Sequence, residues 1–344
     1  SSYASTTLSV PWPIEPCFRR GDRHDAVESH VSMRSAAWPI SRAIGAEHRQ
    51  FNEDIPGPDG IYNDLAELMA RYPLTFSASQ ILFRRYLGRL YEPGTAVIDG
   101  GFGLIMRRGF FNKLYFHGKG LIRNKQYIKI YNLLFSPKAD IFKNEINAEL
   151  RRNAIAAIEA AFSGMPDPDK YPYGKWLDLL AVRYRLPNYS AIDQARADEL
   201  IRGFTPYQQS EIISAAVNIS FPQKLNAGFM KSIIKRNSKI LPEYPLVKKN
   251  LTVPFNLPAM LSSALIKINP GNSAPAIPAS EFMVNFREFI YDRISSRSFR
   301  EYDLYDLNKI QNLLEGYYSG NTGLQRQIDN FLGFEILRSE LLIS

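Results

Sequence analysis

Cysteine is almost absent from this chain, and no hydrophobic run is long. Cys17 is the single cysteine among 344 residues, which excludes an internal disulfide and a cysteine-rich zinc site. The apolar runs fall well short of the roughly 20 residues that a membrane-spanning helix needs. Residues 1–16 lack the basic start and apolar centre of a secretion signal. We therefore expect a cytoplasmic protein without a membrane partner, since a reducing compartment is the simplest one for such a chain.

Acidic residues are missing from one long stretch. No Asp or Glu occurs between Asp99 and Asp140, while the whole chain carries a net charge of +8 and has a pI near 9.3. Cations and aromatic residues are interleaved there, among them Arg107, Arg108, Phe110, Phe111, Lys113, Tyr115, Phe116, Lys119, Arg123, Lys125, Tyr127 and Lys129. This composition favours a polyanion surface or, more simply, a solvated helix face beside a phosphate-facing rim. Because no nucleic-acid motif of defined spacing accompanies the charge, we do not expect a nucleic-acid partner.

A glycine-rich turn follows a short apolar run. Residues 95–98 predict a buried strand that ends in a turn containing Asp99, Gly100, Gly101 and Gly103. In open α/β sheets, ligands lie beyond the carboxyl ends of strands, where glycines let backbone N–H groups approach a phosphate. These four residues are therefore our candidate cofactor-binding residues. Two simpler roles stay open: Asp99 caps the following turn, and the glycines pack tightly against a neighbouring helix.

The chain is expected to change character near residue 110. In residues 1–110, strands expected at 6–10, 46–51 and 95–98 alternate with helices, which predicts an α/β region with a small, mostly parallel sheet. Gly45 is expected to end a helix over residues 27–44. A turn is expected at residues 57–60, followed by helices over 61–72 and 79–90. Leu65, Leu68 and Met69 lie on one face of the first of these helices.

Residues 111–344 are expected to form a larger helical lobe. Apolar periodicity predicts helices over residues 141–162, 176–184, 191–203, 210–217, 226–237, 280–295 and 303–341. Residues 253–278, rich in Pro, Asn and Ser, are expected to form a long surface connection. The helix over 226–237 contains Lys231, Lys235 and Arg236. The simpler expectation is that these side chains face solvent, and the more specific one is that they contact a phosphate.

The order of four segments resembles the synthetase domain of the asparagine synthetase family. Residues 36–51, AAWPISRAIGAEHRQF, resemble the family's helix, "lG-x-x-H" and strand, and residues 96–103, AVIDGGFG, resemble the strand entering its "G-[DE]-G-x-D-E" turn. Residues 193–209, DQARADELIRGFTPYQQ, align without a gap on "D-r-x-x-M-x-x-x-x-E-x-R-x-P-F-L-D". The helix over 226–237 and the following LPEYP resemble "G-K-x-x-x-R" and "lP-x-x-i". The resemblance extends to about Pro254.

This resemblance implies an adenine-nucleotide alpha-hydrolase-like fold and an ATP-dependent ligase. In that family an S-G-G-x-D-S pyrophosphatase loop (PP-loop) binds ATP, and magnesium and a lysine help to expel pyrophosphate as a carboxylate becomes an acyl-adenylate. Ammonia then attacks to form the amide. The implied cofactors are ATP and Mg²⁺, and the implied partners are a small carboxylate substrate and a glutaminase domain upstream.

The chain departs from the family pattern at the charged positions. No S-G-G-x-D-S occurs, and too few residues precede the expected strand at 6–10 for a first strand with its loop and helix. The acidic pair of the glycine turn falls on Phe102 and Gly103. Further on, the family's glutamate, arginine and aspartate fall on Arg202, Phe204 and Gln209. The family lysine falls on Gly228, and Lys231, one helical turn later, is the candidate catalytic substitute.

Losing several groups that stabilise a departing pyrophosphate should abolish turnover, because each alone can cost about a hundredfold in rate. We therefore expect a diverged or inactive asparagine-synthetase-like domain without a metal site. Two alternatives stay open. One is a non-catalytic binding or assembly protein on the same scaffold, and the other is a basic protein that binds polyanions.

Overall fold

Helices make up most of the structure, a computed structural model. It describes residues 39–46, 57–71, 77–79, 81–82, 88, 96–98, 100, 102–107, 110–135, 138–248, 251–258, 261, 265 and 282–342. The expected strands at 6–10 and 46–51 lie largely or wholly outside these residues. Residues 39–43 are helical, and Gly45 follows them with φ +70°, the left-handed conformation in which glycine commonly ends a helix.

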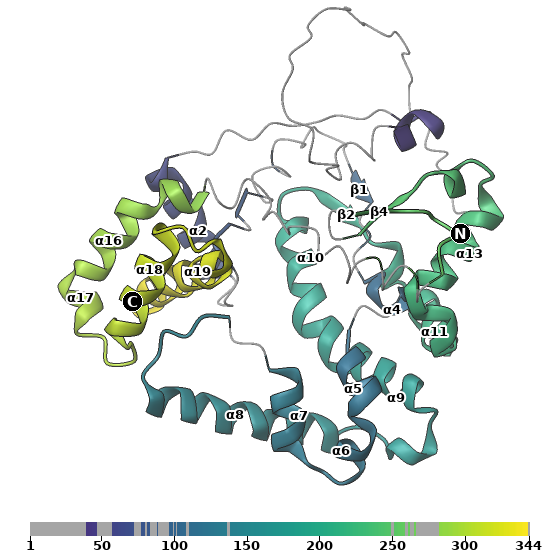
Figure 1. Ribbon diagram of the computed structural model, residues 1–344, viewed down its shortest axis with the longest axis horizontal. Helices are drawn as coiled ribbons and strands as arrows, with labels where there is room; N and C mark the ends of the chain where they lie inside the picture. The colour runs from purple at the N-terminus through teal and green to yellow at the C-terminus, as the bar shows by residue number, and fades with distance from the viewer. Residues whose placement is uncertain are drawn as a thin grey trace, which may run out of the picture.

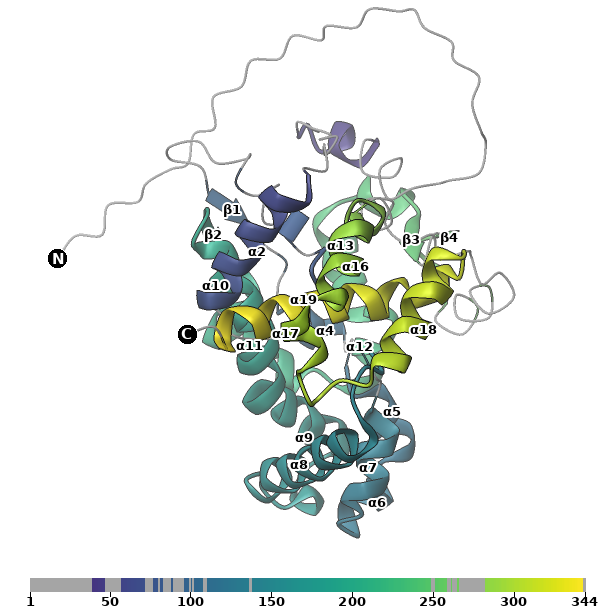
Figure 2. The same ribbon diagram turned by 90° about the vertical axis from the view of Figure 1, so that its left-hand side faces the viewer.

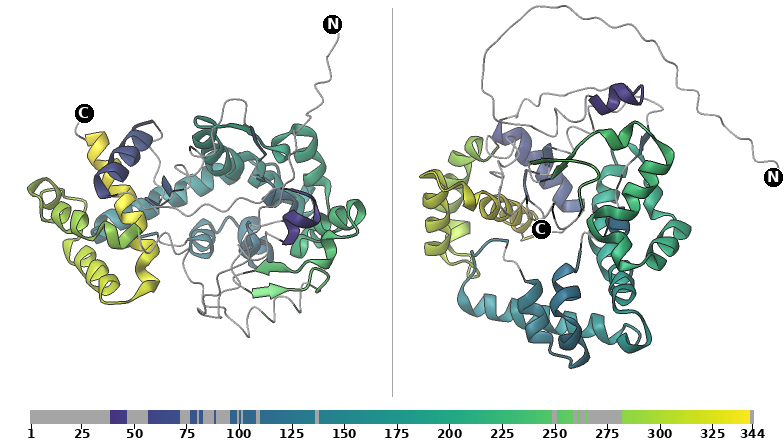
Figure 3. Two further views of the ribbon diagram at one scale, coloured as in Figure 1. Left: turned by 90° about the horizontal axis from the view of Figure 1, so that it is seen from above. Right: turned by 45° about the vertical axis from the view of Figure 1, so that its right-hand side comes forward.

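The C-terminal helices enclose a hydrophobic core together with α2, from near the start of the described chain (Figures 1 and 3). The elements of this part are α2 (Pro58–Arg71), α16 (Arg287–Ser295), α17 (Arg297–Arg300), α18 (Leu307–Tyr318) and α19 (Gln325–Leu342). The helix predicted over 61–72 is confirmed, with Leu65, Leu68 and Met69 buried. The turn predicted at 57–60 is wrong, because Pro58 starts α2, and proline at the first helical position loses no hydrogen bond.

Helix α19 also holds the segment that follows α2. The Asp329 carboxylate accepts hydrogen bonds from the Ser79 backbone N–H (2.8 Å) and the Ser79 hydroxyl (2.5 Å), and the Asp329 carbonyl accepts one from the Ala78 N–H. Burial raises the pKa of Asp329, and these donors oppose that rise. Polar contacts and the α2–α19 core therefore both join the ends of the described chain.

The remaining helices form a second group (Figure 1). They are α4 (Leu104–Arg107), α5 (Asn112–His117), α6 (Lys119–Arg123), α7 (Tyr127–Leu134), α8 (Asn144–Ser163), α9 (Tyr173–Leu180), η2 (Ala181–Ser190), α10 (Ala191–Asp198), α11 (Ser210–Asn218), α12 (Phe221–Lys224) and α13 (Gly228–Asn237). The helices predicted over 141–162, 210–217 and 226–237 are confirmed, with starts shifted by up to three residues. The helix predicted over 176–184 instead continues to Ser190 as η2, a wide π-helix containing Pro187, which lacks a backbone N–H donor.

Two short strands far apart in the sequence pair in parallel. Strand β1 (Ala96–Ile98) lies beside β2 (Arg202–Phe204), with Val97 opposite Gly203. The pair confirms a small parallel sheet beside a large helical lobe. It also joins the ranges 1–110 and 111–344, whose division at residue 110 remains a prediction. The helix predicted over 191–203 is wrong at its end, because α10 stops at Asp198 and residues 202–204 pair with β1 instead.

The strand expected to be buried is open at its carboxyl end. Ile98 is 76 % exposed, and its partner Phe204 is 51 % exposed. Within the described residues no third strand flanks the pair. A parallel strand is buried only when neighbouring strands and helices cover it, so the apolar sequence of β1 did not by itself ensure burial.

A hairpin formed by β3 (Leu246–Lys248) and β4 (Leu251–Val253) follows α13. The surface connection predicted over 253–278 is wrong in its first residues. Val253 and Phe255 are 2 % and 4 % exposed. Val253 ends β4, and Phe255 lies in the turn that follows, where the Leu257 N–H donates to the Pro254 carbonyl (3.0 Å).

One ion pair ties α12 to α9 inside the second group. The Lys224 ammonium lies 2.6 Å from the Asp178 carboxylate, and the two side chains are 0 % and 3 % exposed. A buried charge without its partner carries an uncompensated desolvation penalty. This pair therefore makes the position of α12, and of the chain leading into α13, depend on Asp178.

We predict that Lys224→Met lowers the free energy of unfolding by about 3–5 kcal/mol, because it removes the cation that compensates the charge of the buried Asp178 carboxylate. Urea denaturation measures the loss. Arg297→Ala, which breaks the exposed Arg297–Glu301 pair, should cost less than about 1 kcal/mol. The double variant Lys224→Met, Asp178→Leu should recover much of the loss, and a single-variant loss as small as that of Arg297→Ala would contradict this account.

We predict that Gly203→Ala destabilises the protein by about 1–3 kcal/mol. A Cβ at Gly203 would lie 2.6 Å from Gln194 Nε2 and in contact with Asp198 Oδ1. To make room, Gln194 must strain its buried hydrogen bond from Thr205 (2.8 Å). Gly100→Ala is the matched control, because no atom lies within 4 Å of its Cβ position. Equal melting temperatures of the two variants would refute the prediction.

Candidate functional site

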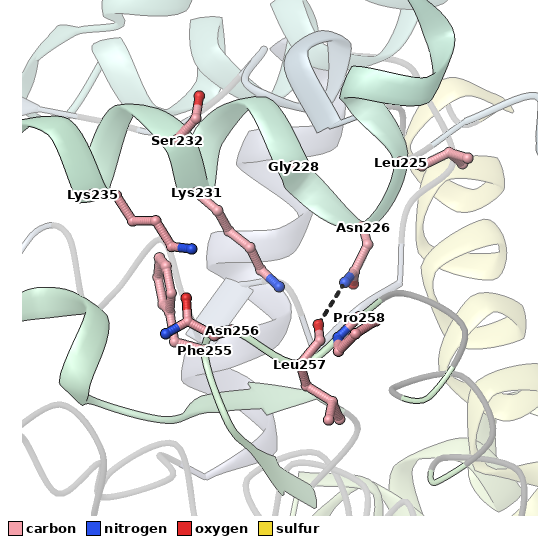
Figure 4. Close-up of a pocket in the computed structure, with 10 residues that line it drawn as sticks. All are labelled: Leu225, Asn226, Gly228, Lys231, Ser232, Lys235, Phe255, Asn256, Leu257 and Pro258. Atoms are coloured by element: carbon pink, nitrogen blue, oxygen red, sulfur yellow. Dashed lines mark hydrogen bonds between the residues drawn. The ribbon is translucent and has the colours of Figure 1, made fainter.

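A pocket of about 290 Å³ lies between α13 and the segment that follows β4. Its lining residues are Leu225, Asn226, Gly228, Lys231, Ser232, Lys235, Phe255, Asn256, Leu257 and Pro258. Lys231 and Lys235 reach from α13 toward residues 255–258, whereas Ser232 points to the other side of the helix (Figure 4). The candidate catalytic residue Lys231 therefore lines a pocket together with a second lysine, one turn later on the same helix.

The pocket lining is cationic and carries no carboxylate. Lys231 Nζ lies 5.7 Å from the centre of the Phe255 ring, a distance at which an ammonium is attracted to the ring face. The Asn226 amide lies 3.5 Å from the Leu257 carbonyl and joins the two walls. Two ammonium groups and two amides can bind an anion, and phosphate groups suit such donors well.

The backbone at the pocket edge is held in an uncommon conformation. Asn226 and Ala227 have φ values of +51° and +57°, and α13 begins directly after them without a side-chain cap. Left-handed backbone costs about 1–2 kcal/mol at a residue with a Cβ, and such strain is often found at ligand sites. Uncapped N–H groups at a helix start also favour an anion nearby.

Gly228 cannot be replaced by the family lysine without a shift of the backbone. A Cβ at Gly228 would lie 2.9 Å from the Gln223 carbonyl oxygen, which belongs to the main chain. The position on which the alignment places the lysine is therefore too tight for one. Lys231, one turn further along α13, is the lysine that lines the pocket.

The glycine turn after β1 is described in part. Asp99 and Gly101 lie outside the described residues, as does His48, the histidine of the segment that resembles the family's "lG-x-x-H". Gly103 donates its N–H to the Gly100 carbonyl (3.2 Å), and a Cβ at Gly103 would lie 3.1 Å from the Tyr207 ring. Gly103 is therefore tightly packed, as the simpler of its two expected roles requires. Gly100 is exposed, and no atom lies within 4 Å of its Cβ position.

The turn and the pocket helix belong to one hydrophobic core. Phe102 and Ile105 pack in the cluster that also receives Tyr207, Phe229 and Met230. Helix α4, which follows the turn, contacts both α13 and η4 (Leu225–Ala227). The Tyr207 hydroxyl lies 4.0 Å from the Met230 sulfur. Three of the segments that carry the family resemblance are therefore close neighbours in space.

The family's charged positions show no catalytic arrangement here. Arg202 is exposed and Phe204 is half-exposed on β2, while Asp193 lies in α10. Among the described residues no group of three His, Cys, Asp or Glu side chains could hold a metal ion. The cations that line the pocket, Lys231 and Lys235, come from α13 instead.

Sequence reasoning missed the opposite wall of the pocket. Phe255, Asn256 and Leu257 fall in the range expected to be a surface connection. Their signal was the alternation of apolar residues at positions 253, 255 and 257 of the sequence, which the nearby prolines hid.

No helix among the described residues combines the length and apolarity needed to cross a membrane. No protein-family model, no curated protein and no solved structure matches this chain.

Proposed function

We propose that this chain is a diverged relative of the asparagine synthetase synthetase domain that binds the phosphates of ATP and does not complete amide formation. The observation that carries the proposal is the carboxylate-free pocket in which Lys231 and Lys235 face residues 255–258. It lies on the same helix in which the resemblance anticipates a catalytic lysine.

The parallel strand pair supports the finer fold, an adenine-nucleotide alpha-hydrolase-like sheet. Parallel pairing puts the carboxyl ends of β1 and β2 at the same edge, which is the edge where α/β sheets bind ligands. The glycine turn leaves from one strand and Pro206 follows the other. Their common core with α13 would place a nucleotide between this edge and the pocket.

The volume favours binding of the phosphates rather than of a whole nucleotide. About 290 Å³ lies at the lower end of the range for small-molecule pockets. Lys231 and Lys235 would contact phosphate oxygens, with the Asn226 and Asn256 amides as further donors. An acyl-adenylate is not expected to form, because the family's glutamate, arginine, aspartate and lysine fall on Arg202, Phe204, Gln209 and Gly228.

We predict that the intact chain binds ATP in isothermal titration calorimetry and that Lys231→Ala and Lys235→Ala each weaken binding by about 10- to 100-fold. Hydrogen bonds to charged groups contribute about 1.5–3 kcal/mol, which corresponds to that loss. Arg236→Ala is the matched control: it lies on the same helix, is exposed and does not line the pocket. We also expect no ATP–pyrophosphate exchange with any added carboxylate.

The outcomes separate the alternatives. No ATP binding by the unmodified chain would reject nucleotide binding and leave a scaffold that serves assembly alone. Equal losses in Arg236→Ala and Lys231→Ala would show attraction to net charge rather than to the pocket. Measurable pyrophosphate exchange would show that adenylation chemistry survives.

A further inference from the structure

The acid-free stretch of the sequence forms three short helices with exposed cations. Lys113 on α5, Lys119 on α6 and Lys129 on α7 are all exposed, as is Lys125 between α6 and α7. Within the described residues none of these four lysines has a carboxylate within 4 Å; Arg123 is the cation in these helices that has one, Asp169. The charge is therefore available to a partner.

An exposed aromatic ring lies among these cations. Phe116 on α5 is 62 % exposed, which is unusual for so large an apolar side chain. It is not loose, because its ring meets Tyr115 at 5.3 Å and 89° and Phe221 at 6.3 Å and 79°. Tyr115 and Phe221 are themselves stacked at 3.4 Å. Packing thus holds the Phe116 ring in place while most of its surface faces solvent.

Helix geometry puts a lysine beside this ring. Residues three apart in a helix are neighbours on its surface, so Lys113 lies on the same face of α5 as Phe116. The exposed residues Asn112, Lys113, Phe116 and His117 together form what we call the α5 face. Lys119, at the start of α6, follows directly. A fixed aromatic ring next to unpaired lysines is the arrangement that binds single-stranded nucleic acid without sequence preference.

We propose that the α5 face binds single-stranded nucleic acid, with a base stacked on Phe116 and the flanking phosphates contacting Lys113 and Lys119. The charge pattern alone did not indicate this partner, because a solvated helix face has the same composition. The exposed and supported ring is the added observation. Helix α5 lies apart from α13, the helix that lines the pocket, in two perpendicular views (Figures 1 and 2).

Fluorescence anisotropy with a labelled oligothymidine of about 20 nucleotides tests the proposal on the intact chain. Phe116→Leu keeps an apolar side chain but removes the ring, and it should weaken binding by about 5- to 150-fold, the equivalent of one stacked base. Lys113→Glu with Lys119→Glu should weaken binding further. The slope of the logarithm of the binding constant against the logarithm of the salt concentration should also become less steep by about 1.4, because each lost phosphate contact removes about 0.7 from that slope.

Arg326→Glu is the charge control, because Arg326 is exposed on α19, away from α5, and it should bind almost as the unmodified chain does. Lys231→Ala should also bind normally, which separates this site from the proposed ATP pocket. Unchanged binding by Phe116→Leu would overturn the stacking role and indicate a general polyanion surface. Equal losses in Arg326→Glu and the Lys113, Lys119 variant, or no binding by the unmodified chain, would overturn the site.

Discussion

The pairing of β1 with β2 is the contact on which the arrangement of the candidate site depends. Six residues form the pair, and about a hundred positions separate the two strands in the sequence. Their alignment sets where the glycine turn, Tyr207 and α4 lie, and these in turn pack against α13. Closing so long a loop costs entropy. The hydrophobic cores and the buried Lys224–Asp178 pair must offset that cost.

Charge in this protein is segregated rather than balanced. Residues 111–190 contain 13 Lys and Arg but only 7 Asp and Glu, so they hold most of the excess of +8. The buried carboxylates are occupied within the fold: Asp178 pairs with Lys224, and Glu335 accepts hydrogen bonds from Arg293, Arg338 and Tyr305. These buried acids therefore have partners inside the fold, whereas Lys113, Lys119, Lys125 and Lys129 face solvent and Lys231 and Lys235 line the pocket.

Local patterns in the sequence predicted the helices well, and they located the chain segments of the site. The apolar residues of α2 and α18 recur at helical spacing, and each of these helices buries one face. Helix α8 has the same spacing, although none of its residues is buried. The short apolar run over 95–98, followed by a glycine-rich turn, indicated β1. Lys231 was identified from its place on an amphipathic helix near the family's lysine.

What the sequence could not predict depends on contacts between distant residues. Nothing local distinguishes Arg202–Phe204 from the end of a helix, since the strand exists through pairing with β1. The exposure of Ile98 depends on what covers a sheet, and the burial of Phe255 depends on the turn that follows β4. Phe116 stays in solvent because Phe221, from another helix, supports its ring.

The left-handed pair Asn226–Ala227 has a consequence for how the pocket would meet a ligand. Glycine would adopt this backbone more easily, yet it would also admit many other conformations before binding. Because both residues carry a Cβ, fewer backbone conformations are accessible to them than to glycine, and the surrounding contacts select the left-handed one. A binding partner would then lose little entropy in ordering the protein. The pocket would then bind its ligand with a backbone that is already fixed. The strain of that backbone, at Asn226 and Ala227, is present in the free protein before any ligand binds.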